Sequence, residues 1–249
     1  YKVTVIASRS EMPEAVDFAD RLVTLPWPKK GKIRRLSPWN YRAQLIEFSR
    51  MVSQQIDHFR PDLIWAEGPL VADYFRRPRK LRRVPVVFHP HGLEMFQKTG
   101  SNLIDSRLIP LRSLTRLHTD QAEVTISQGG KIDAILRDRL RVPLDRIYEL
   151  PNCLPAQFRV ADRPRQTSRR RFIFVGRNEA RKGLSLLLQS LEHVPEASLD
   201  VVGDVPADIS APSNVNFHGM VRDRDALRGF FDRADFLVVP SYAEGMPTV

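Results

Sequence analysis

Residues 236–249 read FLVVPSYAEGMPTV, an apolar run followed by a polar turn that contains glycine. The run Phe236–Pro240 predicts a buried strand, and the acid Glu244 comes just beyond its carboxyl end. Ligands bind at this edge of open α/β sheets. Gly245 allows close backbone approach, and Pro247 suits the first turn of a helix, whose N–H groups and dipole would face an anion. The stretch therefore predicts an anion-binding strand–turn–helix unit.

The first part of the chain alternates predicted strands with helices, which is typical of a doubly wound parallel sheet. The predicted strands are Lys2–Ala7, Asp62–Ala66, Val84–Phe88, Glu123–Ser127 and Arg146–Leu150. The clearest helix runs from Trp39 to Phe59, because apolar residues recur there at three- and four-residue steps before Pro61. A shorter helix is predicted over Gly130–Leu140. We therefore assign residues 1–152 to a first Rossmann-like domain.

A second α/β series begins after a stretch that lacks apolar periodicity. Residues 153–170 contain two prolines and a basic run, so they are predicted to be an interdomain linker. The strands expected beyond it are Phe172–Gly176, Leu199–Gly203 and Val215–His218, with a leucine-rich helix after Gly183 and another helix over Asp223–Arg233. Residues 171–249 thus form a second domain.

Several motifs, in matching order and spacing, are similar to one enzyme family. They are RFIFVGRNEARKG (residues 171–183), LDVVGD (199–204), VNFHG (215–219), EGMPTV (244–249), HPHGLE (89–94) and Pro151–Asn152 with Phe158. Together they resemble the retaining glycosyltransferases of family 4, also called glycosyl transferases group 1. The resemblance covers nearly the whole chain. It implies the GT-B fold, in which two Rossmann-like domains face a cleft.

The resemblance also implies an activity and a setting. The expected enzyme moves a sugar from a nucleoside diphosphate sugar to an acceptor hydroxyl on a polysaccharide, a lipid-linked molecule or a small molecule. The first domain would bind the acceptor and the second the donor. The expected setting is cytoplasmic, in cell-envelope polysaccharide synthesis. The basic first domain further predicts peripheral contact with the inner face of an anionic membrane.

Two departures from the family pattern concern the ends of the chain. The family has a second glutamate after the EG-x-P turn, and it would fall beyond Val249. No glycine-rich loop follows the opening strand, since the first glycine is Gly31. We therefore expect that the first strand and part of the second domain are missing. The chain as written is then expected to lack transferase activity, with Phe236–Pro240 left as an uncovered, aggregation-prone strand.

Composition fits a globular protein with a basic first part. Hydrophobic residues make up 42% of the 249 residues and charged residues 27%, and a single cysteine, Cys153, excludes an internal disulfide. The net charge of +10 lies wholly before residue 167, with dense clusters over residues 29–35 and 76–83. Such clusters attract anionic membranes, acceptors or nucleic acid, although a solvated basic surface would look the same.

Two cations in the loop after the strand Phe172–Gly176 are candidates for binding the donor diphosphate. Arg177 and Lys182 could both reach one anion from the carboxyl edge of the sheet, and pre-placed cations stabilise the charge that builds on a leaving diphosphate. Gly176 belongs to the same phosphate loop. The pair could replace a divalent metal, because the acidic pair Asp223 and Asp225 opens a helix instead of lying in a suitable turn. We expect no metal or other cofactor.

The turn at the end of the chain and a histidine turn in the first domain complete the candidate site. The resemblance implies that Glu244 faces the donor sugar, with the backbone N–H groups of Gly245, Met246 and Thr248 around Pro247 directed at the sugar and phosphate. It also implies that His91 contacts a sugar hydroxyl or places its carbonyl near the anomeric carbon. Each could instead be structural, Glu244 capping a helix and His91 satisfying its turn.

Histidine spacing alone does not predict a metal. His89 and His91 are two residues apart, but no third histidine or cysteine is near them in the sequence. No residue stands out as a nucleophile either, which agrees with the same-face substitution that the resemblance implies. The alternatives are a nucleotide-sugar 2-epimerase of the same fold and a basic module that binds anions or nucleic acid. The latter is disfavoured because the cluster over residues 76–83 has no aromatic residue for base stacking.

Overall fold

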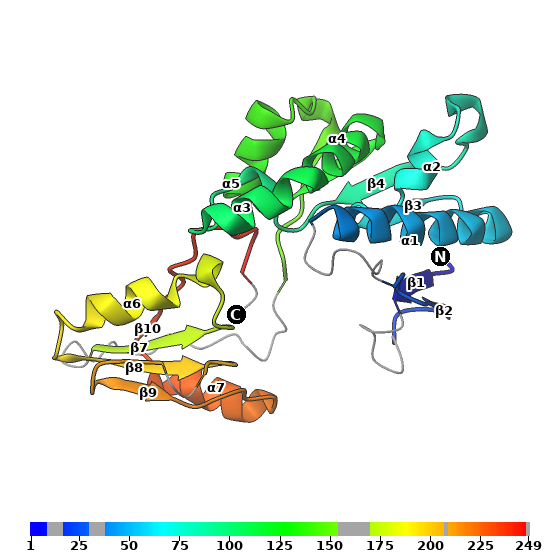
Figure 1. Ribbon diagram of the computed structural model, residues 1–249. Helices are drawn as coiled ribbons and strands as arrows, with labels where there is room; N and C mark the ends of the chain where they lie inside the picture. The colour runs from blue at the N-terminus through cyan, green and yellow to red at the C-terminus, as the bar shows by residue number, and fades with distance from the viewer. Residues whose placement is uncertain (9–16, 30–37, 154–169, 207–208, 248–249) are drawn as a thin grey trace. The chain divides into compact units, whose positions relative to one another are not determined.

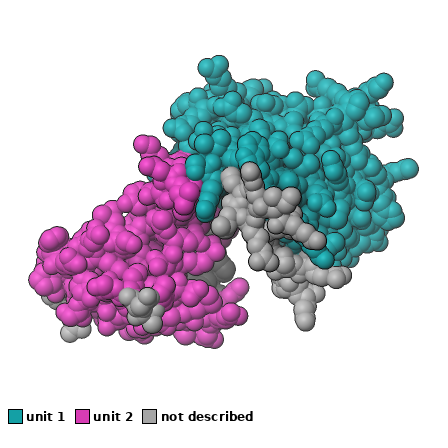
Figure 2. Space-filling model, viewed as in Figure 1, with its two compact units in different colours: residues 1–96, 106–151 teal, residues 97–105, 152–249 magenta. Residues whose placement is uncertain are grey.

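The computed structural model describes residues 1–8, 17–29, 38–153, 170–206 and 209–247. These residues form two compact units, coloured separately in Figure 2. Unit 1 contains residues 1–96 and 106–151, and unit 2 contains residues 97–105 and 152–249. Several predicted features lie outside the described residues. They are residues 154–169 of the predicted linker 153–170, with Phe158 among them, most of the basic cluster at 29–35, and Thr248.

Unit 1 is built on a parallel sheet in the order β3-β4-β5-β6, as the alternating pattern predicted. Figure 1 labels β3 and β4 of this sheet. Its strands are β3 (Ile64–Glu67), β4 (Val86–His89), β5 (Val124–Ser127) and β6 (Ile147–Glu149). The long helix α1 (Pro38–Phe59) packs its apolar stripe onto this sheet, which confirms the periodicity argument. The buried residues that they share include Phe48, Val52, Ile56, Ile64, Val86 and Phe88.

The opening strand does not join this sheet. β1 (Thr4–Ser8) pairs in parallel with β2 (Arg21–Leu25) in a separate two-stranded sheet. β2 was not predicted, although Pro26 follows this five-residue strand directly. Ile6 and Leu25 still pack against the core of the main sheet. Side-chain packing therefore attaches the small sheet to unit 1, while its described strands hydrogen-bond only to each other.

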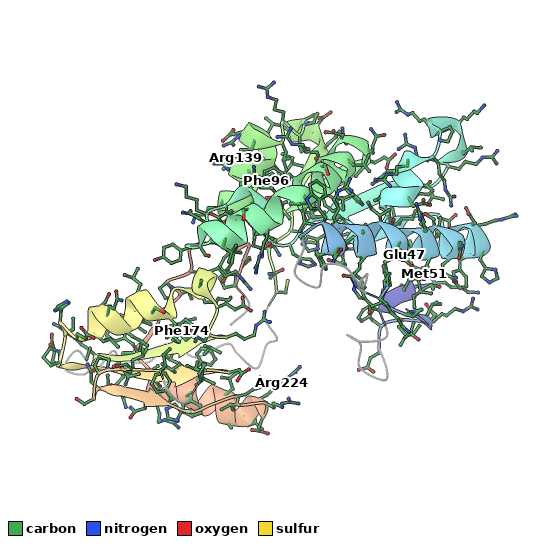
Figure 3. The ribbon with its side chains drawn as sticks, in the orientation of Figure 1. Glu47, Met51, Phe96, Arg139, Phe174 and Arg224 are labelled. Atoms are coloured by element: carbon green, nitrogen blue, oxygen red, sulfur yellow. The ribbon has the colours of Figure 1, made fainter. Side chains whose placement is uncertain are left out.

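Helices complete unit 1. They are α2 (Ala72–Arg76), α4 (Arg112–Gln121) and α5 (Gly130–Ala134), with 3-10 turns at Arg79–Leu81, Glu94–Phe96, Ile109–Leu111 and Leu144–Arg146. The predicted helix over Gly130–Leu140 is present, but its second half, Ile135–Arg139, is a π-helix in which the Leu140 N–H donates to the carbonyl of Ile135. That helix is anchored by Arg139, which donates to the Phe96 carbonyl at 2.5 Å; both residues are labelled in Figure 3.

A buried histidine fixes the loop that follows β3. His118 on α4 is fully buried, donates from Nδ1 to the Leu114 carbonyl at 2.7 Å and accepts at Nε2 from the Val71 N–H at 3.2 Å. Burial lowers the pKa of His118 to about 4. The ring is therefore neutral near pH 7, with both nitrogens satisfied, and it holds the chain segment that begins at Glu67.

Unit 2 is a second parallel sheet, in the order β10-β7-β8-β9 (Figure 1). Its strands are β7 (Arg170–Val175), β8 (Ala197–Val202), β9 (Val215–Phe217) and β10 (Phe236–Leu237). α6 (Leu184–Leu191) covers the sheet through a core around Phe174 (Figure 3), and α7 (Arg224–Arg233) follows β9. α3 (Asn102–Leu108) begins in unit 2. As expected, Asp223 caps a helix: its carboxylate accepts from the Ala226 N–H at 2.7 Å.

The strand after α7 is shorter than predicted and exposed. The apolar run Phe236–Pro240 predicted a longer strand, but β10 is only two residues long. Phe236 and Leu237 are 49% and 41% exposed, as expected for an uncovered strand. β10 lies at an edge of its sheet, where it pairs with β7 alone, and Phe236 stacks on Phe172 at a ring distance of 5.4 Å. An apolar run indicates burial only when both faces of the strand are covered, and no described element covers the outer face here.

Candidate functional site

The loop after β7 and the turn after β10 meet at the carboxyl edge of the unit 2 sheet. Gly183 has a left-handed backbone, with φ +72, and ends the 3-10 turn Ala180–Lys182. A Cβ placed on Gly183 would lie 2.2 Å from the carbonyl oxygen of Pro240. The glycine therefore allows the loop to lie directly against the segment that carries Glu244. A backbone bond from the Tyr242 N–H to the Arg181 carbonyl, 2.8 Å long, joins the two segments.

Charged side chains from both segments form one network. Lys182 Nζ lies 2.5 Å from Glu244 Oε1, and Arg181 Nη1 lies 3.6 Å from the same oxygen. Glu179 accepts from Arg181 at 2.8 Å and lies 3.0 Å from Arg177 Nε. Lys182 and Glu244 are only 18% and 19% exposed, whereas Arg177 is 68% exposed. Three cations and two carboxylates thus leave an excess positive charge at the edge where an anion would bind.

The predicted residues Arg177, Lys182 and Glu244 therefore belong to one network. The sequence reading did not assign Arg181 or Glu179 to it, although both lie in the loop between two assigned cations. The alternation of positive and negative charge along Arg177, Glu179 and Arg181 could have indicated that these side chains pair with one another. What the sequence could not show is that Arg181 joins the two carboxylates, since Glu244 is more than sixty residues away in the chain.

The turn after Glu244 is held from several directions. The Glu244 carbonyl accepts from Gln97 Nε2 at 2.9 Å, and the Met246 carbonyl accepts from Asn152 Nδ2 at 2.9 Å. Ala243 is fully buried. These contacts fix the backbone of the turn that includes Gly245 and Pro247, which is a requirement for any site that binds ligands through main-chain N–H groups.

Two glycines pack the neighbouring loops together. A Cβ on Gly176 would lie 3.2 Å from the ring of Phe174, and Gly203 approaches Gly176 so closely that its Cβ would lie 1.8 Å from the Gly176 carbonyl oxygen. The Gly176 N–H also donates to the Val202 carbonyl at 2.9 Å. The loops after β7 and β8 therefore lie in direct backbone contact at the same sheet edge.

A second polar cluster lies at the carboxyl edge of the unit 1 sheet. Glu67 ends β3 and His89 ends β4, and the parallel register pairs these two residues directly. His91 follows in the predicted turn with a left-handed φ of +34. His89 Nδ1 lies 3.1 Å from Glu67 Oε2, His91 Nε2 forms an ion pair with the same oxygen, and Trp65 Nε1 donates to Glu67 Oε1 at 2.5 Å.

The electrostatics of this cluster favour a charged pair. Burial raises the pKa of Glu67, but hydrogen bonds from His89, His91 and Trp65 outweigh it, so the pKa lies well below its ordinary value. The hydrogen bond to Glu67 raises the pKa of His91, against the effect of burial, and the charge of Glu94 adds to this. The sequence reading missed Glu67, although it begins a Gly–Pro turn after a predicted strand.

Comparisons of the sequence with known protein families identify the family of the chain. Residues 1–153 match the family described as glycosyl transferase 4-like domain, and residues 169–249 match glycosyl transferases group 1. The chain therefore belongs to the GT-B glycosyltransferases of the family 4 type, as its motifs indicated. No curated protein matches the sequence at a significant level.

Solved structures share the fold at low sequence identity. Sucrose-phosphate synthase from Thermosynechococcus elongatus matches 98% of this chain and 67% of its own, with a TM-score of 0.68 and 18% identity. The structure of Anabaena Alr3699/HepE in complex with UDP and glucose matches 89% of this chain and 61% of its own chain, with a TM-score of 0.55 and 16% identity. An E. coli structure described as trehalose-6-phosphate bound with UDP-2-fluoro glucose matches 99% of this chain and 80% of its own chain, with a TM-score of 0.61 and 12% identity. The chain thus spans about three fifths to four fifths of these proteins.

Proposed function

We propose that this protein is a retaining glycosyltransferase that moves a sugar from a nucleoside diphosphate sugar to an acceptor hydroxyl, with the donor bound by unit 2. The observation that carries the proposal is the Lys182–Glu244 contact within a net positive network at the carboxyl edge of the β7–β10 sheet. Two of the fold neighbours, the Anabaena and E. coli structures, hold UDP with glucose or a UDP-sugar.

Lys182 and Arg177 would stabilise the leaving diphosphate. The bond between the anomeric carbon and the diphosphate oxygen breaks in transfer, so negative charge grows on the diphosphate. A mostly buried ammonium acts there in a lower dielectric than water, and it is aimed by Glu244 before the donor arrives. Arg177, exposed and paired with Glu179, offers a bidentate fork to a second phosphate oxygen.

Retention of configuration would follow from same-face substitution. Glu244 is occupied by Lys182 and Arg181, which makes it a poor nucleophile and supports a role in positioning the cations. The acceptor hydroxyl forms its bond to the anomeric carbon on the face that the diphosphate leaves, and its proton passes to a leaving phosphate oxygen. Chain groups then contribute orientation and charge stabilisation.

His91 would donate a hydrogen bond to a sugar hydroxyl. Glu67 fixes its ring through the contact at Nε2, and Glu94 lies close enough to add its negative charge. Glu67 therefore acts as a positioning residue. Its removal should alter donor-sugar preference more than diphosphate affinity.

The test of this function is transfer without divalent metal. Because cations of the chain would replace a metal, the complete gene product should transfer sugar from one member of a panel of UDP-, GDP- and ADP-sugars at an unchanged rate in EDTA. Proton NMR of the product should show the donor's anomeric configuration. Loss of activity in EDTA that Mg²⁺ restores would contradict the metal-free assignment. Epimerisation at the sugar C2 without any acceptor would favour the epimerase alternative.

We further propose that unit 1 faces an anionic acceptor or membrane surface. Within the cluster at 76–83, Arg77 is held by Asp57 at 2.7 Å and Arg82 by Gln121 at 2.8 Å. The remaining cations, Arg76, Arg79, Lys80 and Arg83, are exposed around α2 and the 3-10 turn that follows it. Among the described residues, no helix combines the length and apolarity needed to cross a bilayer.

Vesicle binding tests the membrane proposal. The protein should sediment with phosphatidylserine-containing vesicles and not with neutral ones, and binding should weaken as salt rises, because the Debye length falls from about 10 Å at 0.1 M to about 3 Å at 1 M. The double variant Arg79→Ala, Lys80→Ala should reduce binding about thirtyfold, at roughly 1 kcal/mol for each cation. Arg224→Ala, an exposed cation on α7 (Figure 3), is the matched control. Equal binding to neutral vesicles would contradict the proposal.

A further inference from the structure

We propose that Glu67, His89 and His91 form a binding site for a borderline transition-metal ion, Zn²⁺ foremost. Each residue offers one ligand atom, and the three atoms all lie within 4.8 Å of one another. The sequence reading discounted a metal because no third histidine or cysteine lies nearby. The third ligand is a carboxylate, which the β3–β4 register places beside both histidines.

The backbone brings the three ligands together before any ion binds. Glu67 and His89 occupy paired positions at the ends of parallel neighbours, so their side chains leave the same edge of the sheet. The left-handed turn at His91 returns its ring to His89, at a centroid distance of 4.2 Å. Bond lengths of about 2.1 Å to Zn²⁺ separate tetrahedral ligand atoms by about 3.4 Å, so small side-chain rotations suffice.

Burial and surrounding contacts support a built site. His89 is only 6% exposed, and its Nδ1 faces Glu67 Oε2 at 3.1 Å. Trp65 Nε1 holds Glu67 Oε1, and its ring meets that of His89 edge-on at 5.9 Å. This leaves Glu67 Oε2, the oxygen on which both imidazoles converge, as the ligand atom. Contacts of this kind orient metal ligands in other proteins.

The donor set selects the class of ion. Two imidazoles and one carboxylate suit Zn²⁺ and its neighbours in the first transition row, whereas Mg²⁺ prefers oxygen ligands throughout. His91 and Glu67 are each about half exposed, so the fourth position faces solvent and would hold water. The proposed site is therefore distinct in chemistry from any Mg²⁺ or Mn²⁺ bound through a donor diphosphate.

Binding of Zn²⁺ would occupy the imidazole that the proposed function assigns to the donor sugar, and this consequence rests on that function. Zn²⁺ should then lower glycosyl transfer and EDTA should restore it. An inhibitory ion is compatible with transfer that needs no metal. The ion binding itself is measured without donor or acceptor, so its failure and the failure of the proposed function are distinguishable.

The experiment measures Zn²⁺ binding to the chain by isothermal titration calorimetry and by competition with a chromogenic chelator. Both use a Cys153→Ser background, because the exposed thiol of Cys153 could itself bind Zn²⁺. We expect one ion per chain, and Co²⁺ should give the visible absorption of a tetrahedral N/O site. Glu67→Gln and His91→Asn should each raise the Kd for Zn²⁺ at least tenfold.

The matched control is His218→Asn. His218 also pairs with a carboxylate, Asp200, at 2.6 Å, but no third ligand joins this pair among the described residues. Its replacement should leave Zn²⁺ affinity unchanged. Glu67 and His91 are exposed enough that their variants should keep the parent's circular dichroism, which is to be checked. The proposal is overturned if the parent binds no Zn²⁺, or if folded Glu67→Gln binds it as tightly as the parent.

Discussion

Replacing Lys182 with alanine is expected to lower kcat of glycosyl transfer about 10²-fold or more, the usual cost of losing one transition-state charge partner. The ammonium is 18% exposed and fixed by Glu244 at 2.5 Å, so it is placed before the diphosphate charge develops. Because that charge is larger in the transition state than in the bound donor, kcat should fall more than KM rises. Steady-state kinetics of the complete gene product, with one nucleotide sugar, provide the measurement.

Loss of Lys182 also leaves Glu244 with only the longer contact to Arg181, so a structural effect must be separated from a catalytic one. Lys182→Arg keeps the positive charge and should retain much of the transfer activity. Lys182→Met keeps the length of the side chain without its charge and should lose that activity. Arg177→Ala is expected to cost about 10²-fold as well. Arg224→Ala, on α7, should match the parent. If Arg177→Ala and Lys182→Ala both kept full activity, the diphosphate assignment would be wrong.

Gly183→Ala is expected to destabilise unit 2 by about 3 kcal/mol. A left-handed alanine costs about 1–2 kcal/mol, and a forced overlap in a packed region adds about 1–3 kcal/mol. The new Cβ would lie 2.2 Å from the Pro240 carbonyl oxygen, which is backbone and cannot rotate away. The loop would have to separate from the turn that carries Glu244, so transfer should fall together with stability.

Gly219→Ala is the matched control for this substitution. Gly219 has a similar φ, +67 against +72, but a Cβ there would meet nothing within 4 Å. It should therefore cost only the backbone strain, about 1–2 kcal/mol. The three tryptophans, Trp27, Trp39 and Trp65, all lie in unit 1, so their fluorescence reports that unit while far-UV circular dichroism reports both. If the two variants unfolded at the same urea concentration, the overlap of the new Cβ at position 183 with the Pro240 carbonyl would cost no stability.

The sequence by itself determined the features that depend on neighbouring residues. The periodicity over Trp39–Phe59 predicted α1 to within one residue, and Asp223 was predicted to open the helix that it caps. The strand–turn order placed Arg177, Lys182 and Glu244 at the carboxyl edge of one sheet. These inferences succeed because helix stripes, caps and strand ends are encoded within a few residues.

Only the tertiary structure decided which distant residues meet. Parallel register put Glu67 beside His89, and loop packing at Gly183 put Lys182 against Glu244. It also left the apolar strand β10 at an exposed edge and paired β1 with β2 outside the main sheet. A residue's own neighbours in sequence carry no information on strand order or on what covers a face. The charge partners of both candidate sites therefore follow from the assembled sheets, whereas their edge positions follow from the sequence.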